Sequence, residues 1–192
     1  INSLDKAPQI AETLKVDGRL VIDRRGNDTK VQLTESEGLQ SLPDYPKDMT
    51  ALMLMGQSPL YAFLANIKVF RFDPLAAKEP SSSTTDTSEL DVHGKNVASM
   101  LSMLQRDADF REQVLEWLEL IVPGMENVST EQQRLDGSTV ITFKEASTKT
   151  RFPAKLVSDG TIFVLCILTA VLSRAHKSGI TIIEEPERGI HP

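Results

Sequence analysis

The sequence has a single cysteine, Cys166, among its 192 residues. One cysteine cannot form an intrachain disulfide, and the absence of a disulfide framework is typical of proteins from a reducing compartment. The longest apolar stretch, 161–173, is shorter than the roughly twenty residues that a bilayer-spanning helix needs. No signal-peptide pattern is present either. We therefore expect a cytoplasmic protein that makes no contact with a membrane.

The chain also lacks an excess of positive charge. It has 21 Lys and Arg against 27 Asp and Glu, for a net charge of −6. Nucleic-acid-binding surfaces are typically basic, so this segment alone is not expected to be one. The small basic cluster at 19–25 is more typical of a solvated strand edge. Hydrophobic residues at 40% and charged residues at 25% otherwise suit one ordinary globular domain.

A third absence is the P-loop, the glycine-rich loop that binds nucleotide phosphates. Such a loop has the pattern Gly-x-x-x-x-Gly-Lys-Ser/Thr, because its amides and its lysine hold the phosphates. The only Gly-Lys pair is Gly94-Lys95. Glu89 stands where the first glycine is required, and Asn96 stands where a hydroxyl is required. The chain therefore carries no P-loop.

What the chain does carry is a short β-branched run, 180–183, followed by Glu184 and Glu185. The run predicts a strand buried on both faces of a parallel sheet, and Pro186 must end it. Open α/β sheets bind ligands at the carboxyl ends of their strands. Two adjacent carboxylates there repel each other unless a cation or a shared proton compensates. The alternative interpretation is an acidic surface turn after a strand.

A second informative segment precedes this strand. Ser158 and Asp159 are helix N-cap signals, and the almost uniformly apolar stretch 161–173 predicts a buried core helix. The amino end of such a helix directs free N–H groups and a positive partial charge outward, and Gly160 would let a phosphate approach the backbone. The segment thus predicts an anion site. An ordinary capped core helix is the alternative.

Together the two segments resemble a known family. Val-Ser-Asp-Gly-Thr at 157–161, then Ile-Ile-Glu-Glu-Pro-Glu-Arg-Gly-Ile-His-Pro at 182–192, is similar to the signature motif and Walker B strand of ABC-type ATPase heads. The SMC/RecF-like branch is the nearest, which includes DNA-repair, overcoming-lysogenization-defect (OLD) and anti-phage ATPases. Segments 67–74 and 91–98 add weaker similarity. The resemblance covers roughly residues 60 to 192 and is strong in the last forty.

The resemblance implies a role for each matching residue. Ser158, Asp159 and the Gly160 backbone would contact the γ-phosphate of ATP bound to a second, facing subunit. His191 would lie in the D-loop, along the dimer interface. The catalytic residues are implied by the Walker B match. Glu184 would support Mg²⁺, although an aspartate is more usual there, and Glu185 would orient the attacking water.

The implied fold is the α/β fold of a P-loop NTPase of the ABC/SMC-head type, with a mixed sheet and a helical lobe. Because the P-loop is missing, we expect it upstream of Ile1, with further strands after Pro192. The chain by itself would then neither bind ATP tightly nor hydrolyse it. We expect four parts of one partial domain: core with antiparallel strands (1–77), polar mobile loop (78–91), helical lobe with returning strands (92–150), and signature with Walker B segment (151–192).

Within these parts the patterns predict further elements. A hairpin is expected from the turn signal between two apolar runs, and helices are expected from apolar spacing. The predicted strands are 19–23, 29–34, 67–72, 134–143 and 150–155, and the predicted helical segments are 49–65, 96–105 and 109–121. The last two helices would carry the signature loop, or they would simply pack on the sheet. His93 and His176 are expected at the surface.

The function that follows is ATP binding and Mg²⁺-dependent hydrolysis by a head that pairs with a second copy. DNA or an effector nuclease would be engaged through other parts of the protein, in a DNA-repair or phage-defence machine. The alternative is a nucleotide-gated dimerisation scaffold that controls a partner effector with little or no turnover.

Overall fold

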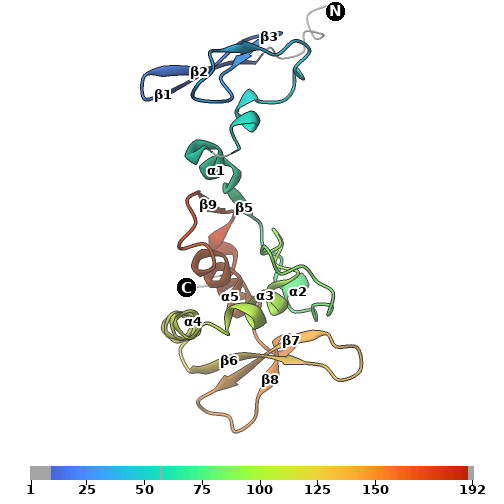
Figure 1. The fold of residues 1–192 in the computed structure, drawn as a ribbon. Helices are drawn as coiled ribbons and strands as arrows, with labels where there is room; N and C mark the ends of the chain where they lie inside the picture. The colour runs from blue at the N-terminus through green and yellow to red at the C-terminus, as the bar shows by residue number, and fades with distance from the viewer. Residues whose placement is uncertain (1–9, 57, 190–192) are drawn as a thin grey trace, which may run out of the picture. The chain divides into compact units, whose positions relative to one another are not determined.

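The structure is a computed structural model that describes residues 10–56 and 58–189 (Figure 1). The backbone contacts divide the chain into two compact units, with the boundary between Ala65 and Asn66. We call the part up to Ala65 unit 1 and the part from Asn66 unit 2. The expected boundary at residue 77 therefore lies within unit 2, after its first strand.

Unit 1 is built on a four-stranded antiparallel sheet in the order β1-β2-β3-β4. The predicted hairpin is confirmed, because β2 and β3 pair in register from Ile22 with Val31 to Arg25 with Asp28. Strand β1, which was not predicted, joins β2 through a tight turn in which Asp17 and Gly18 both have positive φ, at 49° and 79°. The strands are β1 (Ala11–Val16), β2 (Arg19–Arg25), β3 (Asp28–Val31) and β4 (Gln40–Ser41).

The helical segment predicted at 49–65 is broken into two short helices, η1 (Ala51–Met55) and α1 (Pro59–Ala65). Pro59 explains the break, because proline has no N–H to donate and its ring disfavours a helical conformation in the residue before it. Pro59 is tolerated where it stands, as the first residue of α1.

A buried arginine holds the loop of unit 1 onto its sheet. The Arg24 side chain is 1% exposed and donates to the carbonyls of Gly26, Met49 and Pro46, the last at 2.8 Å. Its guanidinium also lies 5.3 Å from the centre of the Tyr45 ring. A buried guanidinium is stable only when its donors are paired. The small core of Ile22, Val31 and Ala51 therefore depends on this polar contact.

We predict that Arg24→Ala lowers the stability of unit 1 by about 2–4 kcal/mol, because it leaves buried carbonyls without a donor. The matched control is Arg25→Ala, since the side chain of Arg25 is 85% exposed and its loss should change stability by less than about 0.5 kcal/mol. Hydrogen exchange followed by mass spectrometry measures the two variants. Full protection of the unit 1 peptides in Arg24→Ala would contradict the prediction.

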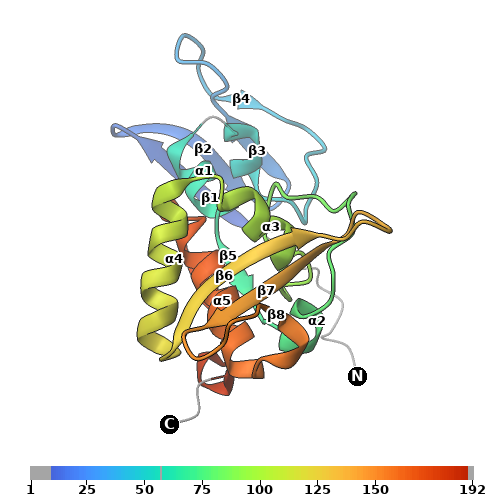
Figure 2. The same ribbon diagram turned by 90° about the horizontal axis from the view of Figure 1, so that it is seen from below.

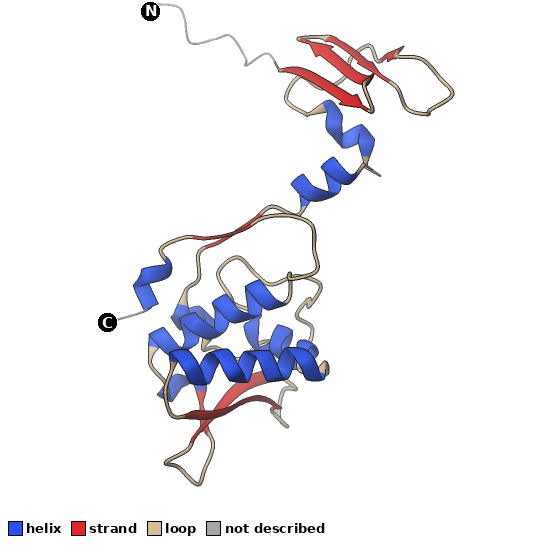
Figure 3. Cartoon of the chain, turned by 90° about the vertical axis from the view of Figure 1, so that its left-hand side faces the viewer, coloured by secondary structure: helices blue, strands red, loops and turns tan. Residues whose placement is uncertain are grey.

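Unit 2 has three layers, with helices between two small sheets, as the views in Figures 1 and 3 show. On one side lies the parallel pair β5 (Lys68–Phe70) and β9 (Thr181–Ile183). On the other side lies the antiparallel sheet β6-β7-β8, which Figure 2 shows crossing the helices. Its strands are β6 (Met125–Gln132), β7 (Thr139–Glu145) and β8 (Phe152–Pro153).

The middle layer is dominated by α5 (Asp159–Leu172), whose buried residues lie on every side of the helix. The sequence prediction of a buried core helix is confirmed. Helices α3 (Val97–Leu104) and α4 (Ala108–Ile121) pack beside it, close to their predicted positions. Shorter elements complete the unit: α2 (Pro74–Ala77), η2 (Ala154–Leu156) and η3 (Pro186–Gly189).

Two of the predicted strands need correction. The strand before Glu184 is not buried on both faces, because Ile182 is 43% exposed. In the described part of the chain β9 pairs only with β5, so one face of the pair packs on α5 through Phe70 and Ile183. The strand predicted at 134–143 begins only at Thr139, after a turn.

Strand β6 was missed because its residues, Met-Glu-Asn-Val-Ser-Thr-Glu-Gln, are mostly polar. The polar loop at 78–91 is also more integrated than predicted. Ser81 in this loop is 3% exposed and exchanges two backbone hydrogen bonds with Thr139. The buried Asn96 amide donates to the carbonyls of Asp86 and Glu89 in the same loop. Backbone pairing, which a polar composition does not reveal, binds the loop to unit 2.

Cys166 lies in the middle of α5 with its side chain fully buried. Burial raises the pKa of its thiol to about 12, because an apolar environment disfavours the thiolate. The cysteine is therefore a core residue and not a nucleophile at neutral pH.

Candidate functional site

The carboxyl ends of β5 and β9 lie side by side, because the two strands run parallel with Phe70 opposite Ile183. The Glu184 amide continues the pairing by donating to the Phe70 carbonyl at 2.9 Å. Arg71 and Glu184 thus follow the two strands at the same edge. Arg71 Nε lies 3.9 Å from Glu184 Oε2, with both side chains roughly half exposed. Such a long, exposed ion pair contributes little stability, so the carboxylate remains available for a ligand.

Glu185 has an unusual backbone conformation, with φ at 50°. Non-glycine residues rarely adopt this left-handed region, and such strain often occurs at functional sites. The conformation lets the chain leave β9 sharply, and η3 begins at Pro186 as the sequence predicted for the end of the strand. Two successive carboxylates are therefore presented at a sharp bend and not along a continuing strand.

The second predicted segment begins α5 with the expected N-cap. Ser158 Oγ accepts a hydrogen bond from the Thr161 amide at 3.1 Å, and the two hydroxyls lie 2.9 Å apart. The first amides of any α-helix have no partner within the helix. At the start of α5 these are the amides of Asp159 and Gly160, since Ser158 already accepts from the Thr161 amide. The segment therefore supplies the outward-directed donors that an anion requires.

A lysine that follows α2 fixes the cap of α5. Lys78 Nζ donates to the Val157 carbonyl at 2.8 Å and to Asp159 Oδ1 at 2.5 Å. Its side chain is 12% exposed, so this contact is shielded from solvent. The adjacent pair, Glu79 with Lys155 at 2.9 Å, is exposed and weaker. Lys78 also compensates the one carboxylate that would otherwise repel an anion at this helix end.

A hollow of about 470 Å³ lies next to the two segments. It is bounded by Arg71, which pairs with Glu184, and by Asp159 at the start of α5. The hollow is lined by Arg71, Phe72, Asp73, Pro74, Leu75, His93, Asp159 and Phe163. Segments far apart in the sequence thus border one space. Ser158 and Gly160 are the sequence neighbours of Asp159, and Glu184 pairs with Arg71. None of the predicted residues Glu184, Glu185, Ser158 and Gly160 is itself among the lining residues.

The sequence reasoning missed three polar residues of this hollow: Arg71, Asp73 and His93. His93 was expected only as a surface residue, yet its Nδ1 lies 2.9 Å from the Arg71 carbonyl. The Asp73 carboxylate accepts from the amides of Leu75 and Ala76 and so caps α2. A usable signal existed, because Arg71 lies near the carboxyl end of the predicted strand at 67–72 and Asp73 directly follows it. The carboxyl end of such a strand belongs at the ligand edge of a sheet.

The remaining predicted residue, His191, lies outside the described residues. Within the described part of the chain no three His, Cys, Asp or Glu side chains come together as a metal site. Glu184 and Glu185 still fit Mg²⁺, because this ion commonly takes one or two carboxylates and completes its shell with waters and substrate phosphates.

The Gly94-Lys95 pair has a structural role. Gly94 has φ at 81°, and a Cβ atom there would lie 3.1 Å from Cys166 Sγ and 3.3 Å from Phe72 Cδ1. Glycine is needed both for the backbone conformation and for the close approach to α5. The pair belongs to the packing of unit 2, in agreement with the absence of a P-loop pattern.

In a comparison with protein families, residues 61–192 match the family described as "AAA domain, putative AbiEii toxin, Type IV TA system". The chain belongs to this family. The AAA domain so defined includes all of unit 2, with both predicted segments and the hollow between them. Neither the curated proteins nor the solved structures that were searched include a match to the chain.

Membership of an AAA domain family supports the broad part of the sequence prediction: an ATPase-type α/β domain that binds and hydrolyses nucleotide, typically with Mg²⁺. The mixed α/β architecture of unit 2 is compatible with such a domain. Of the helices described in the structure, none combines the length and apolar character required to cross a membrane.

We predict that Lys78→Met accelerates hydrogen exchange of the amides at 157–161 by about tenfold or more, because it removes a shielded, charge-assisted contact to the cap of α5. Lys155→Met is the matched control and should change exchange less than threefold or so, since its ion pair is exposed. Amide exchange measured by NMR tests both. Equal effects of the two variants would show that Lys78 does not fix the cap.

We also predict that Gly94→Ala destabilises unit 2 by about 3 kcal/mol, from backbone strain combined with overpacking against α5. Gly124→Ala is its control: Gly124 has φ at 91° but open space around it, so only the backbone cost of about 1 kcal/mol applies. Urea unfolding followed by Trp117 fluorescence, the only tryptophan, measures the difference. Equal costs would mean that the packing at Gly94 can relax.

Proposed function

We propose that this AAA domain is part of an ATPase head of the SMC/RecF-like ABC type, which hydrolyses ATP in a site shared between two copies. The observation that carries the proposal is the common hollow. It is lined by Asp159, at the capped amino end of α5, and by Arg71, which follows β5 and pairs with Glu184. Carboxylates and helix amides are the two kinds of group that a nucleotide-hydrolysing site needs.

The proposed roles follow from the chemistry of each group. Mg²⁺, when bound, would neutralise charge that develops on the phosphates. Glu184 would hold this ion, because its long, exposed pair with Arg71 leaves the carboxylate available. Glu185 would accept a hydrogen bond from the attacking water and orient it.

The cap of α5 would act on the opposite subunit. Ser158, Asp159 and Gly160 would offer a hydroxyl and backbone amides to the γ-phosphate of ATP bound by the facing head, with His191 near the interface. Phosphate at a helix amino end gains from the amides and the helix dipole together. Lys78 supports this role, since it compensates the Asp159 carboxylate. ATP would thus join two heads, and hydrolysis would release them.

We further propose that this switch acts on DNA or on an effector nuclease in a repair or phage-defence machine. The net charge of −6 supports contact with such partners through other parts of the protein, because an acidic surface repels nucleic acid. A nucleotide-gated scaffold with little turnover is the second candidate. It is favoured by the longer Glu184 in place of the usual aspartate.

We predict that Glu185→Gln in the full-length protein lowers ATP turnover by about 100-fold or more, because loss of general-base assistance costs this much. ATP-bound dimers should accumulate, since binding is retained. Turnover assays and light scattering measure these effects. Glu187→Gln, two residues later and also exposed, is the control and should leave turnover unchanged.

An unchanged rate in Glu185→Gln would refute the assignment of the base. If the unmodified protein shows no turnover but dimerises with ATP, the scaffold replaces the hydrolase as the function. Absence of both turnover and ATP-dependent dimerisation would overturn the proposed function as a whole.

A further inference from the structure

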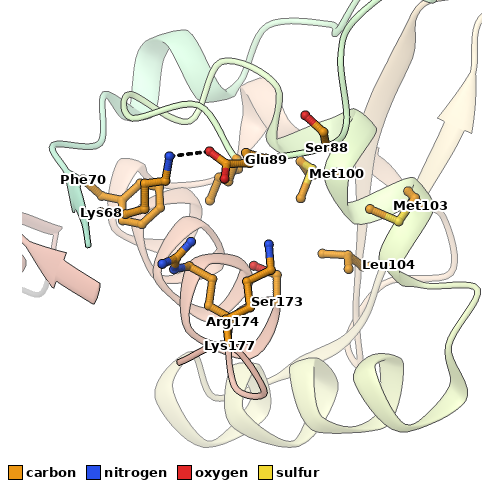
Figure 4. A pocket seen from close by; sticks show the side chains of 11 residues that line it. Lys68, Phe70, Ser88, Glu89, Met100, Met103, Leu104, Ser173, Arg174 and Lys177 are labelled. Carbon is orange, nitrogen blue, oxygen red and sulfur yellow. Dashed lines mark ion pairs between the residues drawn. The ribbon is translucent and has the colours of Figure 1, made fainter. Parts of the chain in front are cut away.

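A second pocket lies at the other end of α5. We call it the basic pocket; its volume is about 220 Å³. Figure 4 shows it from close by, between the start of β5, helix α3 and the residues that follow α5. It is lined by Lys68, Phe70, Ser88, Glu89, Leu90, Met100, Met103, Leu104, Ser173, Arg174 and Lys177. It shares no lining residue with the hollow at the amino end of α5.

One wall of the basic pocket is apolar and flexible. Met100 and Met103, from α3, lie beside Leu104 and opposite the charged residues (Figure 4). Met100 is 3% exposed, so this wall continues the core of unit 2. Methionine side chains adapt their shape to a ligand more readily than branched ones. The wall therefore suits a compact apolar group, and the methionine side chains can adapt to the shape of that group when it binds.

The opposite wall carries more positive than negative charge. Lys68, Arg174 and Lys177 line it together with a single carboxylate, Glu89. Lys68 Nζ lies 2.5 Å from Glu89 Oε2 and so compensates that carboxylate. The hydrogen bond from Lys68 lowers the pKa of Glu89, and the charges of Lys177 and Arg174 act in the same direction. Glu89 is therefore ionised and already paired at neutral pH.

The other two cations remain without an acidic partner. Arg174 donates to Thr181 Oγ1 at 3.1 Å and to the Asn66 carbonyl, both neutral groups. Among the described residues no carboxylate lies within ion-pair distance of Arg174 or Lys177. The carboxyl end of α5 contributes only about half a negative charge. A net positive charge thus faces an apolar wall across a small space.

We propose that the basic pocket binds a small organic anion, with its charged group against Arg174 and Lys177 and its apolar body against Met100 and Met103. Pockets for drug-sized ligands measure roughly 300–1,000 Å³, so the basic pocket suits a smaller ligand. A phosphate or carboxylate carried on one ring or a short chain has the right size and chemistry. A nucleoside triphosphate is too large, so the site is separate from the proposed ATPase site.

The methionines provide a direct test in the 192-residue chain. With ¹³C-methyl-labelled methionine, titration with phenyl phosphate should shift the methyl signals of Met100 and Met103 until they saturate. Met49, Met53 and Met55 lie in unit 1 and serve as internal references. Benzyl alcohol, which lacks the charge, and inorganic phosphate, which lacks the ring, should each bind at least tenfold more weakly.

Lys177→Met should weaken binding of phenyl phosphate by about tenfold, because it removes a pocket ammonium that has no carboxylate within ion-pair distance among the described residues. Lys149→Met, which removes an exposed lysine outside the pocket, should leave the affinity unchanged. Lys177 is preferred over Arg174 because Arg174 also holds the backbone at Asn66. Unchanged reference methyl signals and an unchanged unfolding midpoint by Trp117 fluorescence would verify that the variant folds.

Three results would overturn the inference. Absence of saturable shifts at Met100 and Met103 would mean that the cations only neutralise the partial negative charge at the carboxyl end of α5. Equal binding of inorganic phosphate would remove the role of the apolar wall. Equal affinities of Lys177→Met and the parent chain would remove the role of the charge.

Discussion

The burial of α5 is the constraint on which the rest of unit 2 depends. A helix with apolar residues on every side cannot lie at a surface, so it must be covered all round. The strands β5 and β9 cover one side through Phe70 and Ile183, and the helices α2, α3 and α4 also pack on α5. Even the turn at Gly94 is fixed by α5, because its backbone must approach Cys166 closely. The pair β5-β9 packs on this helix through β9, whereas the sheet β6-β7-β8 packs on α3 and α4.

Because α5 is enclosed along its length, only its two ends are accessible. The two ends differ in the polar and charged groups that surround them. At the amino end, Ser158 caps the helix and Lys78 neutralises Asp159, so outward-directed amides border the candidate site. At the carboxyl end, Arg174 and Lys177 provide positive charge beside an apolar wall. A helix of 14 residues is about 21 Å long. The proposed ATPase site and the basic pocket are therefore both attached to one rigid element of the core.

The sequence predicted two local features of the candidate site. Ser158 as N-cap and the parallel strand before Glu184 were predicted from local patterns, because caps and β-branched runs depend on residues that are close together in the sequence. The residues that complete the hollow, Arg71, Asp73 and His93, come from a distant segment. Their importance depends on the pairing of β5 with β9, which no local pattern encodes.

The errors in the predicted fold have the same cause, because local patterns do not encode the pairing of distant segments. Strand β6 has little hydrophobic alternation, and it forms because β7 offers a partner along its whole length. Ser81 is buried in a polar loop because its backbone pairs with Thr139. The exposed outer face of β9 was predicted as buried because the β-branched run suits a parallel sheet covered on both sides. Long-range backbone pairing, which composition does not reveal, decided each of these cases.

The buried Cys166 can be used to measure how often the core of unit 2 opens. Its thiol, with a pKa raised to about 12, cannot react with an alkylating reagent while α5 is enclosed. Labelling therefore requires the enclosing layers to separate. Since this cysteine is the only one, the rate at which it is modified reports how often the core of unit 2 opens.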